Sequence, residues 1–364
     1  MTQLMKDLKK IMITALAALV GGALFSLLHI PVPWLLGPML VMVICKNVMK
    51  WNLTWPSELR DSGMIIVGYT IGLSMTSAAL KEMAEQLPSM LLLTILLMLW
   101  CSGIAFLVSK VSKIDFQSAL LGSIPGGLTQ VIMLAEETKG INLAVVTITQ
   151  VLRLMIIVIS MPLLVMLPIF SNVSGDQVST TTVDSVGMFP NIVFFALVCI
   201  VFAIGGNKIH FPTAYLLGPI IGTALLQLTG VAGPHLPAAV VDLAQLMIGS
   251  HVGLMLQTDQ IVKKGWTFTL AIGSGILLMV GSILLSILLT VLHDVSHATA
   301  LLSLAPGGMD QMGIIAHEIN ADLSMVSGYQ LFRTFFIFFA IPPLLKVLFK
   351  AMERKNHQVS KDTK

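Results

Sequence analysis

The sequence predicts an all-α protein that crosses a membrane several times. Of its 364 residues, 56% are apolar and only 11% are charged, whereas about a quarter of the residues in an ordinary soluble domain are charged. Apolar runs recur along the chain with the length of roughly 18 to 25 residues that a helix needs to cross a bilayer. The segments between these runs are too short to form a separate soluble domain.

The apolar segments of the first half follow one another in a regular order. Lys9 and Lys10 precede the first run in the manner of a signal peptide. No small-residue cleavage pattern follows, so we expect a first membrane helix there. The sequence predicts helices at 11–28, 33–49, 61–79, 88–109 and 142–168, with a helix-breaking Pro-Gly-Gly segment at 116–138.

The second half repeats the first at a constant offset of 181 residues. The stretch HIPVPWLLGP from His29 aligns with HFPTAYLLGP from His210, and Pro125 aligns with Pro306. A constant offset over this length indicates an internal duplication. We therefore predict a first membrane repeat at 11–168, an external linker at 169–189, a second membrane repeat at 190–348 and a cytoplasmic basic tail at 349–364.

The distribution of basic residues indicates that the two repeats are inverted. With the N-terminus inside, only Lys81 of the 21 Lys and Arg residues is external, Arg153 and Arg333 lie within membrane segments, and the remaining 18 are cytoplasmic. This agrees with the rule that positive residues stay inside, and a parallel duplication would violate it. Both termini are thus expected on the cytoplasmic side of the membrane.

An inverted repeat needs an odd number of crossings in each half, yet each half has six candidate segments. We predict about five transmembrane helices per repeat plus one Pro-Gly-Gly segment that enters and leaves the membrane on the same face. The alternative is that the Pro-Gly-Gly segments cross fully and another segment, such as 61–79, does not.

A helix broken inside a membrane predicts a binding site. Proline and glycine leave backbone groups exposed that lipid cannot satisfy, so these groups must face protein, water or a ligand. Two breaks entering from opposite faces would meet near the midplane, where secondary transporters bind their solutes. The candidate solute-binding residues at the two breaks are Pro125, Gly126, Gly127, Thr129 and Gln130, and Pro306, Gly307, Gly308, Asp310 and Gln311.

A second pair of motifs adds Gln150 and Arg153 in the first half, with Gln330 and Arg333 in the second. The spacing of three residues places each pair on one helix face. A guanidinium inside a membrane must face the bundle interior and find a partner. Two roles remain open for these pairs. They can bind the solute, or they can clamp a hairpin carbonyl or one of the glutamates 136, 137 and 318.

Asp310, His317 and Glu318 are candidate sites for a coupling proton or cation. For Asp310 the alternative is a helix cap, and for His317 and Glu318 it is a solvated helix end. No Ser/His/Asp or Cys/His set, zinc motif or other metal site is evident, so we expect no enzymatic activity, no catalytic residues and no cofactor.

The repeated motifs resemble a known family. WLLGPM from Trp34 and YLLGPI from Tyr215, combined with the two Pro-Gly-Gly segments and an Arg-containing helix after each, are similar to the AbrB family of duplicated bacterial integral membrane proteins. The resemblance covers essentially the whole chain. Members carry labels that imply ammonia monooxygenase or transcriptional regulation. The soluble DNA-binding AbrB is a different, β-rich protein that this chain does not resemble.

The sequence favours a secondary transporter of a small anionic solute that works by alternating access. The alternative is a membrane-embedded sensor that affects gene expression through a partner protein. The expected partners are the solute and the lipid bilayer, without nucleic acid, and a homodimer is compatible with the sequence.

Overall fold

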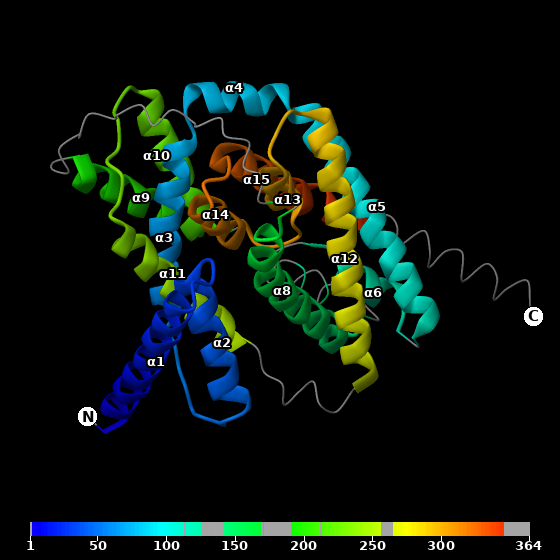
Figure 1. The fold of residues 1–364 in the computed structure, drawn as a ribbon, viewed down its shortest axis with the longest axis horizontal. Helices are drawn as coiled ribbons and strands as arrows, with labels where there is room; N and C mark the ends of the chain where they lie inside the picture. The colour runs from blue at the N-terminus through cyan, green and yellow to red at the C-terminus, as the bar shows by residue number, and fades with distance from the viewer. Residues whose placement is uncertain are drawn as a thin grey trace, which may run out of the picture.

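A computed structural model of the chain describes residues 2–112, 114–125, 131, 135, 141–168, 170, 191–211, 213–255 and 265–345. Within these ranges the regular secondary structure is helical, and no strand occurs (Figure 1). The first half contains α1 (Thr2–Leu27), α2 (Pro33–Asn47), α3 (Ser57–Ser74), α4 (Ser77–Glu85), α5 (Leu87–Val111), α6 (Phe116–Ser123) and α8 (Leu143–Val165).

The second half contains the corresponding series without a described counterpart of α4. Its helices are α9 (Asn191–Lys208), α10 (Ala214–Leu228), α11 (Ala238–Met255), α12 (Gly265–Leu292), α13 (His297–Leu304), α14 (Met309–Glu318) and α15 (Leu323–Phe339). The predicted helices 33–49, 88–109 and 142–168 agree with these bounds to within a few residues. The predicted helix 11–28 ends within one residue of α1 but starts nine residues later than α1, and the predicted helix 61–79 is divided into α3 and α4. The two helices meet at a bend of 82°, so that α4 lies across one end of the molecule (Figure 1).

Several long apolar helices indicate a multi-pass membrane protein. Six of the described helices are long and apolar enough to cross a bilayer, and α3 with α4 would make a seventh. With 15 residues each, α2 and α10 fall short of the roughly 20 residues that a crossing helix needs. The number of crossings per repeat therefore stays a prediction.

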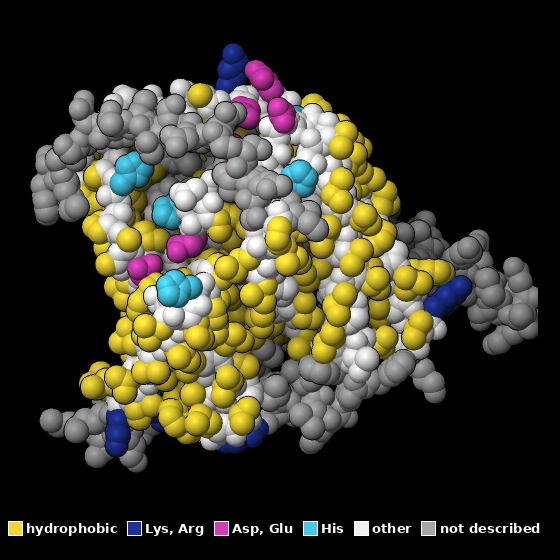
Figure 2. All heavy atoms as spheres, viewed as in Figure 1, with side chains coloured by type: hydrophobic (Ala, Val, Ile, Leu, Met, Phe, Trp, Pro, Cys, Tyr) yellow, Lys and Arg dark blue, Asp and Glu magenta, His cyan; other side chains and the backbone are white. Residues whose placement is uncertain are grey.

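The outer surface agrees with a membrane environment. Hydrophobic side chains cover most of the face shown in Figure 2, whereas the basic side chains lie at its margins. Leucines on α1, α5 and α9, such as Leu16, Leu99 and Leu197, are about 60% exposed. A soluble protein rarely exposes such large continuous apolar areas.

Glycines allow α3 to pack closely on α10, and α11 on α2. A Cβ atom added to Gly68 would lie closer than 3.0 Å to the carbonyl oxygen of Leu216, and one added to Gly249 would lie as close to that of Leu35. Gly249 follows Gly68 by 181 positions, and Leu216 follows Leu35 by the same number. The same close contact therefore occurs twice, each time between one helix from each half.

Candidate functional site

Two short helices end at the sequence-predicted breaks. In the second half, α13 has eight residues and α14 has ten, which corresponds to about 12 and 15 Å at 1.5 Å per residue. Neither helix alone crosses a hydrocarbon core of about 30 Å. In the first half, α6 also has eight residues, and the description continues to Pro125. Gly126, Gly127, Thr129 and Gln130 lie outside the described residues.

Capping residues fix where each short helix begins. Asp115 accepts a 2.8 Å hydrogen bond from the backbone N–H of Ser118 at the start of α6, and Ser296 accepts one of 3.2 Å from Thr299 at the start of α13. Such caps satisfy backbone donors that have no partner inside the helix. The two caps are 181 positions apart, so both breaks are built in the same way.

Arg333 and Gln330 on α15 satisfy the carbonyl groups at the end of α13. Arg333 donates from Nη1 to the oxygen of Ala305 at 2.7 Å, and from Nη2 to that of Gly307 at 3.1 Å. Gln330 donates to the oxygens of Leu302 at 2.7 Å and Ala305 at 3.1 Å, and its own oxygen accepts from Arg333. The last carbonyls of a helix lack partners and form its negative end, so a buried cation is stabilised there.

Arg153 and Gln150 on α8 make the equivalent contacts with the end of α6. Arg153 donates from Nη1 to the oxygens of Ile124 at 2.7 Å and Gly122 at 3.3 Å. Gln150 donates to the oxygens of Leu121 at 2.7 Å and Ile124 at 3.1 Å, and accepts from Arg153 at 2.5 Å. Both arginines are about 95% buried. Their guanidinium groups therefore hold the two breaks through backbone carbonyls at or directly before each break.

The two breaks and both arginines border one cavity of about 210 Å³, which we call the central cavity. Pro125 and Arg153 reach it from the first half, and Pro306 and Arg333 from the second. The tip of the second break also packs on the first half, because Gly307 lies against Ile157 of α8. Besides the two arginines, the polar or charged side chains lining the cavity are Arg60, Thr213, His251, Asp310, Gln311 and Thr334.

Asp310 and Gln311 lie in the first turn of α14, where the helix presents its positive end. Both are buried, with 8% and 3% of their surfaces exposed. The Gln311 amide donates a 2.8 Å hydrogen bond to the Asp310 carboxylate. Asp310 does not cap α14, because the residue at the cap position is Gly308 and no side chain bonds there.

Position 308 requires glycine because there is no room for a side chain, and not because of its backbone conformation. Its φ angle is −76°, which any residue can adopt. An added Cβ atom would however lie closer than 3.0 Å to side-chain oxygens of both Asp310 and Gln311. These two oxygens therefore converge over the break at a point that a methyl group would fill.

Arg60 and His251 are cavity residues that the sequence analysis did not single out. Arg60 donates to the Asp61 carboxylate at 2.6 and 2.9 Å, and its Nη1 lies 3.3 Å from Nε2 of His251 on α11. The sequence shows Arg60 only as a basic residue at the polar start of an apolar helix, and such a residue is predicted to lie on the cytoplasmic side. The Arg60–His251 contact exists because α3 packs against α11.

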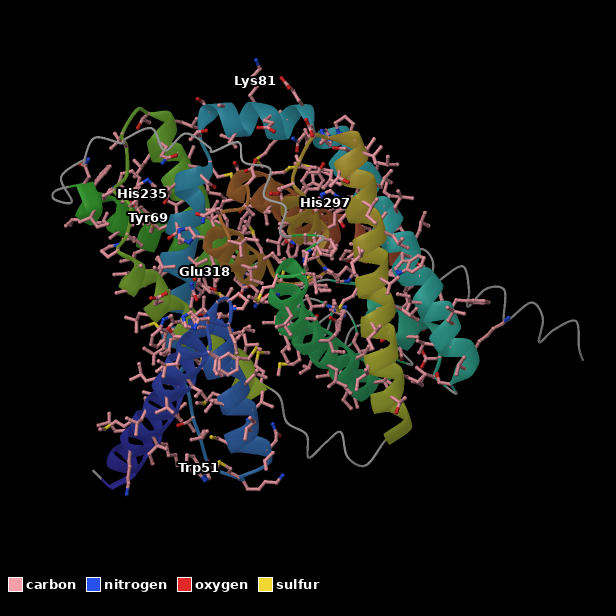
Figure 3. All side chains as sticks on the ribbon, viewed as in Figure 1. Trp51, Tyr69, Lys81, His235, His297 and Glu318 are labelled. Carbon is pink, nitrogen blue, oxygen red and sulfur yellow. The ribbon has the colours of Figure 1, made fainter. Side chains whose placement is uncertain are left out.

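His317 and Glu318 lie at the C-terminal end of α14 (Figure 3). Both side chains are exposed, and neither borders the central cavity. Among the described residues, no group of three or more His, Cys, Asp or Glu side chains is placed to hold a metal ion.

A larger groove of about 580 Å³ lies between α5 and α12. Its lining is almost entirely apolar and includes Leu99, Trp100, Leu277 and Leu284. Because these residues belong to the exposed apolar surface of two long membrane helices, the groove has the character of a lipid-facing depression. The polar central cavity is the better candidate for a solute site.

Comparison with known proteins identifies the family. A family model described as "Transition state regulatory protein AbrB" matches residues 34–349. The chain belongs to the AbrB family. It is 26% identical over 369 aligned positions to "Uncharacterized protein YhjN" of Bacillus subtilis (strain 168), covering 95% of this chain and 94% of that protein. It is 23% identical to "Putative regulator AbrB" of Escherichia coli (strain K12), covering 89% of this chain and 92% of that protein. The similarity to these AbrB relatives extends over nearly the full length of the chain, including both breaks.

Proposed function

We propose that this AbrB-family protein is a secondary transporter that moves a small anionic solute across the bacterial cytoplasmic membrane by alternating access. The observation that carries the proposal is that one polar cavity borders both helix breaks and both buried arginines. Broken helices around a shared site are the usual way in which secondary transporters bind solutes within the bilayer. The cationic lining favours an anion.

The proposal includes two inverted repeats that rock against each other. The repeated contacts at an offset of 181 or 180 residues support it: the Gly68 and Gly249 crossings, the Asp115 and Ser296 caps, and the two arginine clamps. In Figure 1, α6 and α8 of the first half lie largely below α13 and α15 of the second half. The cytoplasmic location of both termini is part of the same proposal.

If transport of the solute is coupled to a proton or cation, the residue that binds this ion should lie close to the solute. Of the three candidates, Asp310 lies in the central cavity beside the solute position, whereas His317 and Glu318 are exposed at the far end of α14. We therefore assign the coupling role to Asp310.

The second candidate function is a sensor that binds the solute without moving it. It is favoured by the name of the Escherichia coli relative, which refers to regulation. Such a sensor would need a partner protein to reach gene expression, and we propose no direct contact with nucleic acid.

Flux through the purified protein separates these two functions. Liposomes that contain only this protein would be assayed for uptake of labelled acetate, propionate, lactate and malonate, with protein-free liposomes as the control. A transporter gives saturable, protein-dependent uptake of at least one anion. Binding of an anion without any uptake would contradict transport and support the sensor.

A further inference from the structure

We propose that the solute is a small hydroxycarboxylate that carries a single negative charge, such as lactate. This inference rests on the proposed function only in using the central cavity as the solute site. It follows from two buried polar atoms that lack partners, from the charge of the lining and from the cavity's size.

The first atom is a hydrogen-bond donor on Arg153. Its Nη1 and Nη2 atoms bond to the hairpin carbonyls and to Gln150. Its Nε atom is buried and has no hydrogen-bond partner among the described residues. Leaving such a charged donor unpaired is costly, so a ligand that occupies the cavity should supply an acceptor there. A carboxylate is the acceptor that arginine binds best.

The second atom is an acceptor, the side-chain oxygen of Gln311. This oxygen is buried and has no hydrogen-bond partner within the described part of the chain. The amide nitrogen of the same side chain donates to Asp310. Gln311 belongs to the second half and Arg153 to the first, yet both border the central cavity. A solute that satisfies both atoms must accept at one end and donate at the other. A simple carboxylate such as propionate cannot donate.

The charge of the described lining limits the solute to one negative charge. In the state in which Asp310 carries no coupling proton or cation, Arg153 and Arg333 contribute two positive charges and ionised Asp310 contributes one negative charge. Arg60 is compensated by its ion pair with Asp61. One positive charge remains in a buried space where uncompensated charge is costly. A monoanion neutralises it, whereas a zwitterionic amino acid does not, and a dianion overcompensates.

The cavity size agrees with a solute of this class. A cavity of about 210 Å³ is large enough for several water-sized groups. A hydroxy acid of three to five carbon atoms fits this volume. The combined features therefore define a hydroxyl donor near Gln311 and a carboxylate near Arg153.

The test is a binding experiment with four ligands of similar size, performed on the purified full-length protein in detergent. Lactate, propionate, alanine and malonate would be titrated by calorimetry against the wild type and against Gln311→Leu, which removes the unpaired acceptor. Gln227→Leu is the matched control. It also removes a buried, unpaired glutamine oxygen, but Gln227 lies on α10 and does not border the central cavity.

We expect the wild type to bind lactate roughly threefold to tenfold more tightly than propionate, which is the usual effect of one hydrogen bond. Gln311→Leu should remove this preference, and Gln227→Leu should retain it. Equal binding of lactate and propionate, tighter binding of alanine or malonate, or no binding of any of the four would overturn the proposal. Lactate binding without flux in liposomes would instead contradict transport and leave the ligand assignment intact.

Discussion

Arg333 donates a 2.7 Å hydrogen bond from Nη1 to the carbonyl oxygen of Ala305, directly before the Pro306-Gly307-Gly308 break. Arg153 makes the equivalent 2.7 Å bond to Ile124 in the first half. Both arginines also border the central cavity. The groups that hold the broken backbone thus also line the cavity proposed to bind the solute, so changes in binding at this site should be accompanied by changes in stability.

Replacing Gln150 or Gln330 should destabilise the helix break to which its side chain bonds. Gln150→Leu and Gln330→Leu each leave buried carbonyls without a donor, and an unsatisfied buried polar group costs about 1–3 kcal/mol. We expect a lower melting temperature for each variant in detergent. Gln227→Leu, whose side chain lies on α10 and makes none of the described hydrogen bonds at the breaks, should melt like the wild type. Unchanged melting of both clamp variants would contradict the structural role.

The two glycines of the second break should respond differently to alanine. At Gly308 the added methyl group must displace oxygens of both Asp310 and Gln311, whereas at Gly307 it meets mainly the flexible end of Met312. We expect Gly308→Ala to weaken anion binding by at least tenfold in calorimetry and Gly307→Ala to weaken it much less. The reverse order would mean that Asp310 and Gln311 do not form the solute site.

Gly68 and Gly249 should be equally intolerant of a side chain. Alanine at either position would press on a backbone carbonyl of the neighbouring helix, and overpacking of this kind costs about 1–3 kcal/mol. Gly273 on α12 is the control, because no atom lies within 4 Å of its added Cβ. Thermal unfolding should show both crossing variants melting well below Gly273→Ala. A large effect at only one of them would argue against equivalent halves.

The inverted arrangement can be tested at a pair of loop positions 181 residues apart. Lys50 follows α2, and Val231 follows α10. The first loop lies at the lower end of the molecule with Trp51, and the second lies in the upper part with His235 (Figure 3). In a background without the native cysteines, a membrane-impermeant maleimide added to intact cells should label Val231→Cys and not Lys50→Cys. Labelling of both from the same side would indicate a parallel duplication.

Much of this fold could be predicted because it is repeated in the sequence. The Pro-Gly-Gly segments marked the ends of α6 and α13, and the spacing of Gln330 and Arg333 placed them on one face of α15. Local patterns could not show that each of these arginines bonds to backbone carbonyls and to the glutamine side chain of its own half. That result depends on how α15 packs against α13, which is a tertiary relationship.

Features without a described counterpart in the other half were harder to find. Arg60 and His251 have no counterparts at the equivalent positions, where Val241 and Thr70 stand, so the repeat gave no signal for them. The short helix α4 was also missed, because its first residues were included in the predicted helix 61–79 and no residue pattern marked the 82° bend after α3. Both features arise from packing between helices.

The central claim is that the cavity between the two breaks carries a small anion across the membrane. It is tested most directly by counterflow, in which liposomes containing the purified protein are loaded with unlabelled lactate and diluted into a trace of labelled lactate. The account predicts transient accumulation of label by the wild type and Lys81→Gln, and a large loss of accumulation in Gly308→Ala. Absence of accumulation in the wild type, or full activity of Gly308→Ala, would contradict it.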